Sequence, residues 1–176
     1  MRAVAYFIDA LNERIGRAVS WLALLIVLLQ FLIVVGRYVF GVGSIWLQEL
    51  IIYMFGFMFM LGAAYTLRHD GHVRVDIFFR EAPPRQKAIV NLVGSIVFLI
   101  PVCALIFWVA WPYVMQSWSI FEGSQESSGI PARYLQKTAI LAFAALMALQ
   151  GLSMIIHSVL ALGGDEKELD ALRIGE

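Results

Sequence analysis

Charged residues are scarce in this 176-residue chain: Asp, Glu, Lys and Arg together make up 15% of it, whereas apolar residues make up 61%. A soluble domain carries about a quarter charged residues, and a chain of this length cannot enclose so large an apolar excess in one core. The composition therefore excludes a soluble enzyme and a disordered chain. Basic and acidic residues are equally numerous, 13 of each, so no excess of positive charge indicates a nucleic-acid partner.

Cysteine, nucleotide-binding motifs and paired histidines are also lacking. The single cysteine, Cys103, cannot form an internal disulfide. The chain has no phosphate-binding loop of the G-x-x-x-x-G-K-[ST] kind. His157 is the only histidine within a long apolar run, whereas a haem held between helices needs two axial ligands. We therefore predict no catalytic residues, no cofactor-binding residues and no metal ligands in this chain, and no enzymatic activity.

Four long uncharged runs are present instead, with lengths of 19, 18, 34 and 27 residues. A helix crosses a hydrocarbon layer of about 30 Å with about 20 residues. The runs lack the two-residue alternation of membrane strands. We therefore predict an all-α integral membrane protein, a single membrane domain over residues 1–176. Its four transmembrane helices are expected at roughly 18–38, 45–67, 86–111 and 135–162.

The segments outside these spans are short. In residues 1–17, Val4, Ile8, Leu11 and Ile15 recur at helical spacing, which predicts an amphipathic helix lying in the membrane interface. Residues 163–176 are acidic, and we expect an exposed tail there.

Basic residues are distributed unequally between the two sides of the predicted bundle. One side carries the turns between the first and second spans and between the third and fourth spans. It has only Arg37, Arg133 and Lys137 as basic residues. By the positive-inside rule, both termini are expected in the cytoplasm. The ten basic residues on the side of the termini are Arg2, Arg14, Arg17, Arg68, Arg74, Arg80, Arg85, Lys87, Lys167 and Arg173.

Few polar side chains fall within the spans, where they are energetically expensive. We expect Gln30 and Gln150 to form hydrogen bonds between helices, and His157 to lie near the cytoplasmic interface. Since no acidic or basic residue lies near the centre of a span, the chain does not look like a pump on its own.

Two groups of residues at the span ends are candidates for a partner interface or a structural role. Arg37 and Glu49 flank the turn between the first two spans, where they can pair with each other or with a partner, or reach separately into the headgroups. Trp46 and Tyr53 lie about one helical turn to either side of Glu49. In the loop after the second span, Arg68, His72 and Asp76 are candidates for binding a partner or anionic lipid headgroups.

The stretch from Arg37 to Asp76 resembles the DctQ-like small membrane subunit of tripartite ATP-independent periplasmic (TRAP) transporters. The four-span layout and the Ser/Gly-rich loop before Ile130-Pro131 also fit this family. One departure is Gln48, where many relatives carry a second acid beside Glu49. The matching elements are Arg37-Tyr38-Val39-Phe40, Trp46-Leu47-Gln48-Glu49, Tyr53, Leu61-Gly62-Ala63-Ala64, Arg68, His72 and Asp76.

The resemblance implies a bacterial inner-membrane scaffold subunit that works with a large polytopic membrane subunit and a periplasmic solute-binding protein. Organic acid uptake would be driven by an ion gradient, with sodium expected on the partner subunit. Two other classes stay open: a four-helix exporter working as a homo-oligomer, and a membrane anchor of a redox complex. The absence of a mid-membrane acid argues against the first, and the missing histidine pairs argue against the second.

Overall fold

The computed structural model describes residues 1–72, 79 and 82–173, and the regular structure in this part of the chain is entirely helical. Four helical stretches are long and apolar enough to cross a membrane, which confirms the predicted all-α, four-span fold. The elements in chain order are α1 (Arg2–Phe40), α2 (Ile45–Arg68), α3 (Pro84–Gly94), the π-helical turn η1 (Ser95–Leu99), α4 (Ile100–Ser119), α5 (Arg133–Leu162) and α6 (Glu166–Arg173).

The turn between α1 and α2 is set by two local signals. Gly41 adopts a left-handed conformation with φ of 67°, and the N–H of Val42 donates to the carbonyl of Gly36 at 2.9 Å. This geometry closes the C-terminus of a helix and favours glycine. Ser44 then caps α2, because its hydroxyl oxygen accepts the N–H of Leu47 at 3.3 Å. The chain therefore reverses within residues 41–44.

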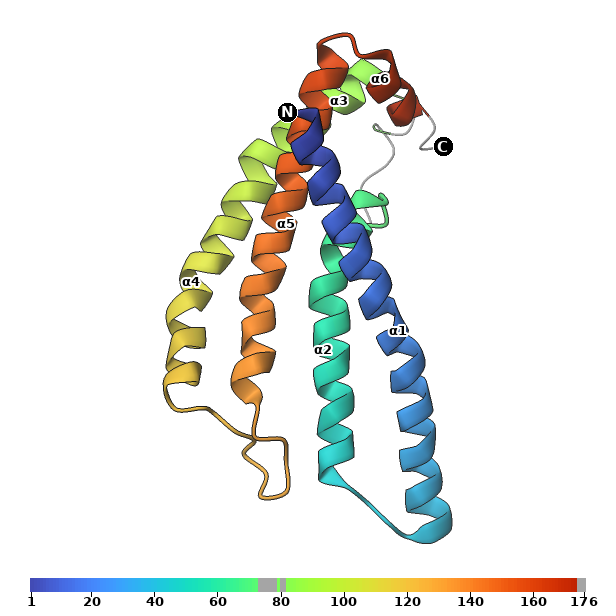
Figure 1. Ribbon diagram of the computed structural model, residues 1–176, viewed down its shortest axis with the longest axis vertical. Helices are drawn as coiled ribbons and strands as arrows, with labels where there is room; N and C mark the ends of the chain where they lie inside the picture. The colour runs from blue at the N-terminus through green and yellow to red at the C-terminus, as the bar shows by residue number, and fades with distance from the viewer. Residues whose placement is uncertain (73–78, 80–81, 174–176) are drawn as a thin grey trace.

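The helices form two pairs, α1 with α2 and α4 with α5 (Figure 1). The pairs are joined because α5 also packs against α1 and α2. They converge at the end that carries the N-terminus, α3 and α6, whereas residues 41–44 and 120–132 connect the helices at the opposite end (Figure 1).

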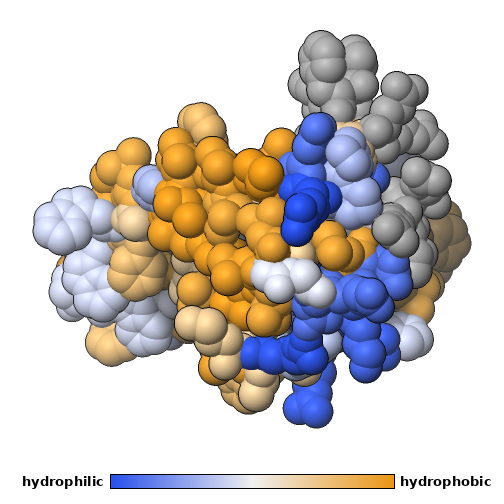
Figure 2. Space-filling view, turned by 90° about the horizontal axis from the view of Figure 1, so that it is seen from above, coloured by the Kyte–Doolittle hydropathy of each residue, from blue (hydrophilic) through white to orange (hydrophobic). Residues whose placement is uncertain are grey.

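The apolar core is small for a chain of this composition. One cluster joins Ala64, Cys103 and Met147, and a second joins Ala110, Val114 and Leu141. Each span contains an apolar stretch of 18 residues. The buried share of this stretch is only 6% in α1, 6% in α2 and 11% in Pro84–Ser119, against 39% in α5. Seen from the end with the N-terminus, hydrophilic residues gather beside a broad hydrophobic area (Figure 2). The helix sides are therefore apolar and largely uncovered, as expected of a bundle surrounded by lipid or by a partner.

Residues 2–17 are helical, as predicted, but they are continuous with the first predicted span. These residues are the first part of the 39-residue helix α1. Their buried face matches the expected apolar series only in part: Ile8 is 4% exposed, but Val4 is 51% exposed, and the polar Asp9 and Asn12 are buried beside Ile8. The physical reason is that α5 supplies hydrogen-bond partners for these polar groups, so the segment packs on the bundle.

Two other boundaries differ from the prediction. The helical stretch that contains the predicted third span, 86–111, is longer than that span, because helical structure continues from Pro84 through η1 and past Pro112 to Ser119. Of the predicted exposed tail, 163–176, the structure describes residues 163–173, where α6 packs against α3 and α5 and Glu168 is only 8% exposed. The predicted spans 45–67 and 135–162 agree with α2 and α5 within two residues at each end.

Gly16 lies at a close approach of helices α1 and α2. A Cβ atom added there would lie 2.2 Å from Cγ of Tyr65, a separation that no packed structure tolerates. At Gly62, on the facing helix, an added Cβ would meet its nearest neighbour, Cγ2 of Val19, at 3.8 Å, which is ordinary contact. The lack of a side chain at position 16 therefore permits this crossing.

We predict that Gly16→Ala destabilises the bundle by about 1–3 kcal/mol, the usual cost of overpacking. Gly62→Ala is the matched control, and it should be neutral or slightly stabilising because alanine is the better helix former. Thermal unfolding in detergent, followed by circular dichroism, measures both variants. Equal stability of the two variants would contradict the close crossing.

Candidate functional site

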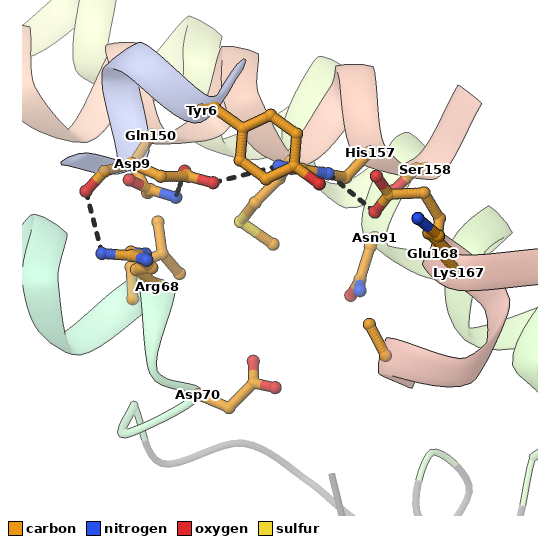
Figure 3. A pocket seen from close by; sticks show the side chains of 13 residues that line it. Tyr6, Asp9, Arg68, Asp70, Asn91, Gln150, His157, Ser158, Lys167 and Glu168 are labelled. Atoms are coloured by element: carbon orange, nitrogen blue, oxygen red, sulfur yellow. Dashed lines mark hydrogen bonds and ion pairs between the residues drawn. The ribbon is translucent and has the colours of Figure 1, made fainter. Parts of the chain in front are cut away.

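A cluster of polar side chains lies where α1, α5 and α6 meet, at the end with the N-terminus (Figure 3). We call it the Asp9 cluster. Five of its six members are buried, so polar groups that are energetically expensive to bury are concentrated here. Its members are Asp9 and Asn12 of α1, Gln150, Ser153 and His157 of α5, and Glu168 of α6.

The Asp9 carboxylate is the centre of this cluster. Its Oδ1 accepts the hydroxyl of Ser153 at 2.7 Å and the amide N–H of Gln150 at 3.1 Å. Its Oδ2 lies 3.0 Å from Nε2 of His157. The same Gln150 accepts the amide N–H of Asn12 at 2.7 Å. A carboxylate in this position needs several donors to offset its lost hydration, and α5 provides three of them.

His157 lies between two carboxylates. Its Nε2 faces Asp9, and its Nδ1 lies 2.8 Å from Oε2 of Glu168 on α6 (Figure 3). The ring of Tyr6 packs edge-on against the imidazole, with centroids 5.7 Å apart. His157 therefore links α5 both to the first helix and to the last one.

The end of α2 is tied to α1 beside this cluster. Arg68 donates to the main-chain carbonyl of Asp9 at 2.9 Å and to the Glu13 carboxylate at 2.5 Å. Glu13 also faces Nε2 of His69 at 2.8 Å and pairs with Arg17 at 2.7 Å. These contacts bring α2 to the same junction.

A cavity of about 340 Å³ opens at the junction of the helices. It holds groups of both charges, with Arg68 and Asp70 from α2 and the residues after it, and Lys167 and Glu168 from α6. Asn91 of α3 and Ser158 of α5 also line it (Figure 3). The cavity gives water access to His157, whose side chain is 26% exposed.

A second polar cluster, at the opposite end, holds the loop of residues 120–132. The Glu49 carboxylate accepts the hydroxyl of Ser124 and, at 2.6 Å, the main-chain N–H of Ile130. Gly129 makes this contact possible, because a Cβ at position 129 would lie 2.6 Å from Oε2 of Glu49. Glu49 therefore fixes a loop that follows it in sequence by more than seventy residues.

The base of the same loop carries an ion pair. Nζ of Lys137 lies 2.5 Å from Oε2 of Glu122 and 4.0 Å from the centroid of the Tyr113 ring. The ammonium of Lys137 holds the pKa of the Glu122 carboxyl below its ordinary value. Trp118 adds a hydrogen bond from its indole N–H to Thr138 at 2.8 Å. Both ends of the loop are thus fastened to α5 or α2.

The structure separates the candidate residues named from the sequence into two groups. Arg37, Trp46, Glu49 and Tyr53 lie toward the end with the 120–132 loop, and Arg68 and His72 lie toward the Asp9 cluster. His72 reaches back to the carbonyl of Ala63 at 3.2 Å. Asp76 lies outside the described residues.

Pairing of Glu49 with Arg37, one of the predicted alternatives, is not what the structure shows for Glu49. Its described hydrogen-bond partners are Ser124 and Ile130. Arg37 is exposed at the end of α1, and its guanidinium lies over the turn near Gly43. A contact of either residue with a partner protein stays a prediction.

Sequence reasoning did not place Asp9, Asn12, Ser153 or Glu168 in a site. A signal was present: Asn12 follows Asp9 by three residues, and Gln150, Ser153 and His157 are spaced by three and four. Such spacing puts each set on one helix face. The predicted interhelical role of Gln150 is confirmed, whereas Gln30 is exposed on α1.

Comparisons with known proteins identify the family. Residues 26–161 match the family described as "Tripartite ATP-independent periplasmic transporters, DctQ component". The chain is 34% identical, over 63% of its length, to a TRAP transporter small permease protein of Haemophilus influenzae, with 66% of that relative covered. It is 29% identical, over 52% of its length, to the C4-dicarboxylate TRAP transporter small permease protein DctQ of Vibrio cholerae, with 38% of that relative covered. No solved structure matches the chain.

We predict that Gln150→Leu destabilises the protein by about 1–3 kcal/mol, because it leaves Asn12 without its acceptor and takes a donor from Asp9. Gln30→Leu is the matched control, since the same change falls on an exposed position of α1. Thermal unfolding in detergent compares the two. Similar melting temperatures for both variants would show that the Asp9 cluster contributes little.

Proposed function

The chain belongs to the DctQ component family of tripartite ATP-independent periplasmic transporters, and on this basis we propose that it is the small membrane subunit of such a transporter. The match over residues 26–161, which includes the last 15 residues of α1, all of α2 to α4 and all but the last residue of α5, is the observation that carries the proposal. The matched relatives are named small permease proteins of TRAP transporters, and they are only partly covered by this chain.

The proposed partners are a large polytopic membrane subunit and a periplasmic solute-binding protein. The large subunit would carry the solute site and the sodium sites, and uptake would be driven by the ion gradient. An organic acid is the proposed solute class, and the C4-dicarboxylate in the name of the Vibrio cholerae relative supports it. This chain would act without a cofactor of its own.

A scaffold role suits the distribution of polar groups. The two clusters, around Asp9 and around Glu49, lie at opposite ends of the bundle, and each fastens helices or a loop of this chain to one another. Three of the four spans leave nearly all of their most apolar window uncovered. Such surfaces support a subunit that packs along a larger membrane protein while the rest of its surface faces lipid.

The proposed location is the bacterial inner membrane, with the Asp9 cluster at the cytoplasmic side and the 120–132 loop at the periplasmic side. The excess of basic residues on the side of the termini supports this orientation. In this arrangement the loop held by Glu49 faces the compartment of the binding protein. We propose that this loop is part of the surface on which that protein docks.

Cysteine labelling tests the orientation. In a Cys103→Ser background, a cysteine at the exposed Ser128 should react with a membrane-impermeant maleimide added to intact spheroplasts, and a cysteine at the exposed Glu166 should react only after lysis. The basic-residue asymmetry is the reason for this expectation. Labelling of Glu166→Cys from outside would reverse the proposed orientation.

Reconstitution tests the function. The chain alone in liposomes should take up no organic acid, whereas the chain with its large subunit and binding protein should show uptake that depends on a sodium gradient. Glu49→Gln should slow this uptake severalfold, because an amide cannot accept both the Ser124 hydroxyl and the Ile130 N–H as a carboxylate does. Glu126→Gln, an exposed acid on the same loop, is the matched control.

The outcomes separate the alternatives. Uptake by the chain alone would overturn the scaffold role and favour a self-contained transporter. Normal uptake with Glu49→Gln would contradict the docking role of the loop and leave the subunit assignment intact. Failure to co-purify with the large subunit would contradict the assignment itself.

A further inference from the structure

The position of His157 between two carboxylates imposes a condition on its protons. An ionised carboxylate only accepts hydrogen bonds, and a neutral imidazole has one N–H to donate. Nε2 lies 3.0 Å from Asp9 and Nδ1 lies 2.8 Å from Glu168. The neutral imidazole carries one proton on its ring nitrogens. Both contacts are hydrogen bonds only when the triad of Asp9, His157 and Glu168 holds a second proton. Without that proton, a ring nitrogen lone pair faces a carboxylate.

The two carboxylates differ in their freedom to move. Asp9 belongs to a 39-residue helix and is also held by Ser153 and Gln150. Glu168 belongs to α6, an eight-residue helix that follows the Gly163–Gly164 turn, where Gly164 has a φ of 92°. A helix of eight residues is not stable without its packing contacts. Of the two elements that carry these carboxylates, α6 is therefore the less firmly held.

The other charged groups around His157 come from each packed element. Tyr6 and Asp9 face it from α1, Arg68 and Asp70 share its cavity from α2 and the residues after it, and α3 contributes the neutral Asn91. Lys167 and Glu168 line the cavity from α6. Among these groups, Glu168 is the one that accepts from Nδ1 of His157, so this atom provides a direct polar contact between α5 and α6.

We propose that His157, with Asp9 and Glu168, is a proton-binding site that controls the docking of α6. With the proton bound, Nε2–H donates to Asp9, Nδ1–H donates to Glu168, and α6 covers the cavity. As the pH rises through the titration of the imidazole, the Nδ1 proton leaves to water through the cavity. Nε2–H stays on the fixed Asp9, the Nδ1 lone pair repels Glu168, and α6 is released. The pair between Arg2 and Asp165 keeps the base of α6 near α1 in both states.

Accessibility of Ser158 reports this motion in the full-length protein. Ser158 is 4% exposed and lines the cavity together with Lys167 and Glu168 of α6, whereas Glu166 is exposed. In a Cys103→Ser background, the maleimide reaction rate of Ser158→Cys is divided by that of Glu166→Cys, measured in a second protein. The ratio is compared at about pH 6 and about pH 8.5, which bracket the usual titration of histidine.

We expect the ratio to rise roughly tenfold between these pH values, the effect of losing one charge-assisted hydrogen bond. Glu168→Gln should abolish the rise, because its amide can donate to a neutral Nδ1 and accept from a protonated one. Glu168→Ala should give a high ratio at both pH values. Circular dichroism confirms that each variant keeps its helices.

Three results would overturn the proposal. An unchanged ratio between the two pH values shows that α6 docking ignores the proton. An equal rise in Glu168→Gln places the cause outside the His157–Glu168 contact. A low ratio in Glu168→Ala shows that this contact does not hold α6. Since none of these readouts involves transport, the proposal stands or fails independently of the proposed function.

Discussion

The buried carboxylate of Asp9 is the constraint on which the arrangement of the helices depends. An ion in this position is stable only when surrounded by donors, and those donors come from Gln150, Ser153 and His157, more than 140 residues later. The first and last spans must therefore lie side by side. Arg68 binds the main-chain carbonyl of Asp9 and brings α2 to the same place. Helices that share little apolar core are in this way held at one end by a polar junction.

At the other end the constraint is a loop rather than a helix crossing. Glu49 accepts hydrogen bonds from Ser124 and Ile130, and the Lys137–Glu122 pair closes the loop at its base. Between the two ends, the described contacts among helices are chiefly those of small and apolar side chains, such as Ala64 against Met147. Directional contacts thus define the geometry of the ends, and the middle of the bundle is left with packing alone.

The fold was predictable from the sequence where one physical variable decides it. The lengths of uncharged runs follow the thickness of the hydrocarbon layer, and α2 and α5 lie within two residues of their predicted bounds. The amphipathic pattern of residues 1–17 was ambiguous, because a helix lying on a membrane and one packing on a bundle both have an apolar face. The buried face became apparent only with α5 in place. The contact of Glu49 with Ile130 spans 81 positions, and that of His157 with Glu168 joins two different helices, so neither follows from local spacing.

A polar junction at one end has a mechanical consequence for a small membrane subunit. Because its helix sides are apolar and uncovered, a partner or lipid can cover them without breaking any hydrogen bond within the chain. The junction carries the long-range polar contacts of Asp9 and Asn12 in α1, so a change there alters the relation of α1 to α5 without touching the apolar sides. Conversely, substitutions along the exposed face of α4, where Trp108 is 80% exposed, change the surface offered to a partner while leaving the junction intact. The chain thus separates the residues that hold its own fold from the surface available for assembly.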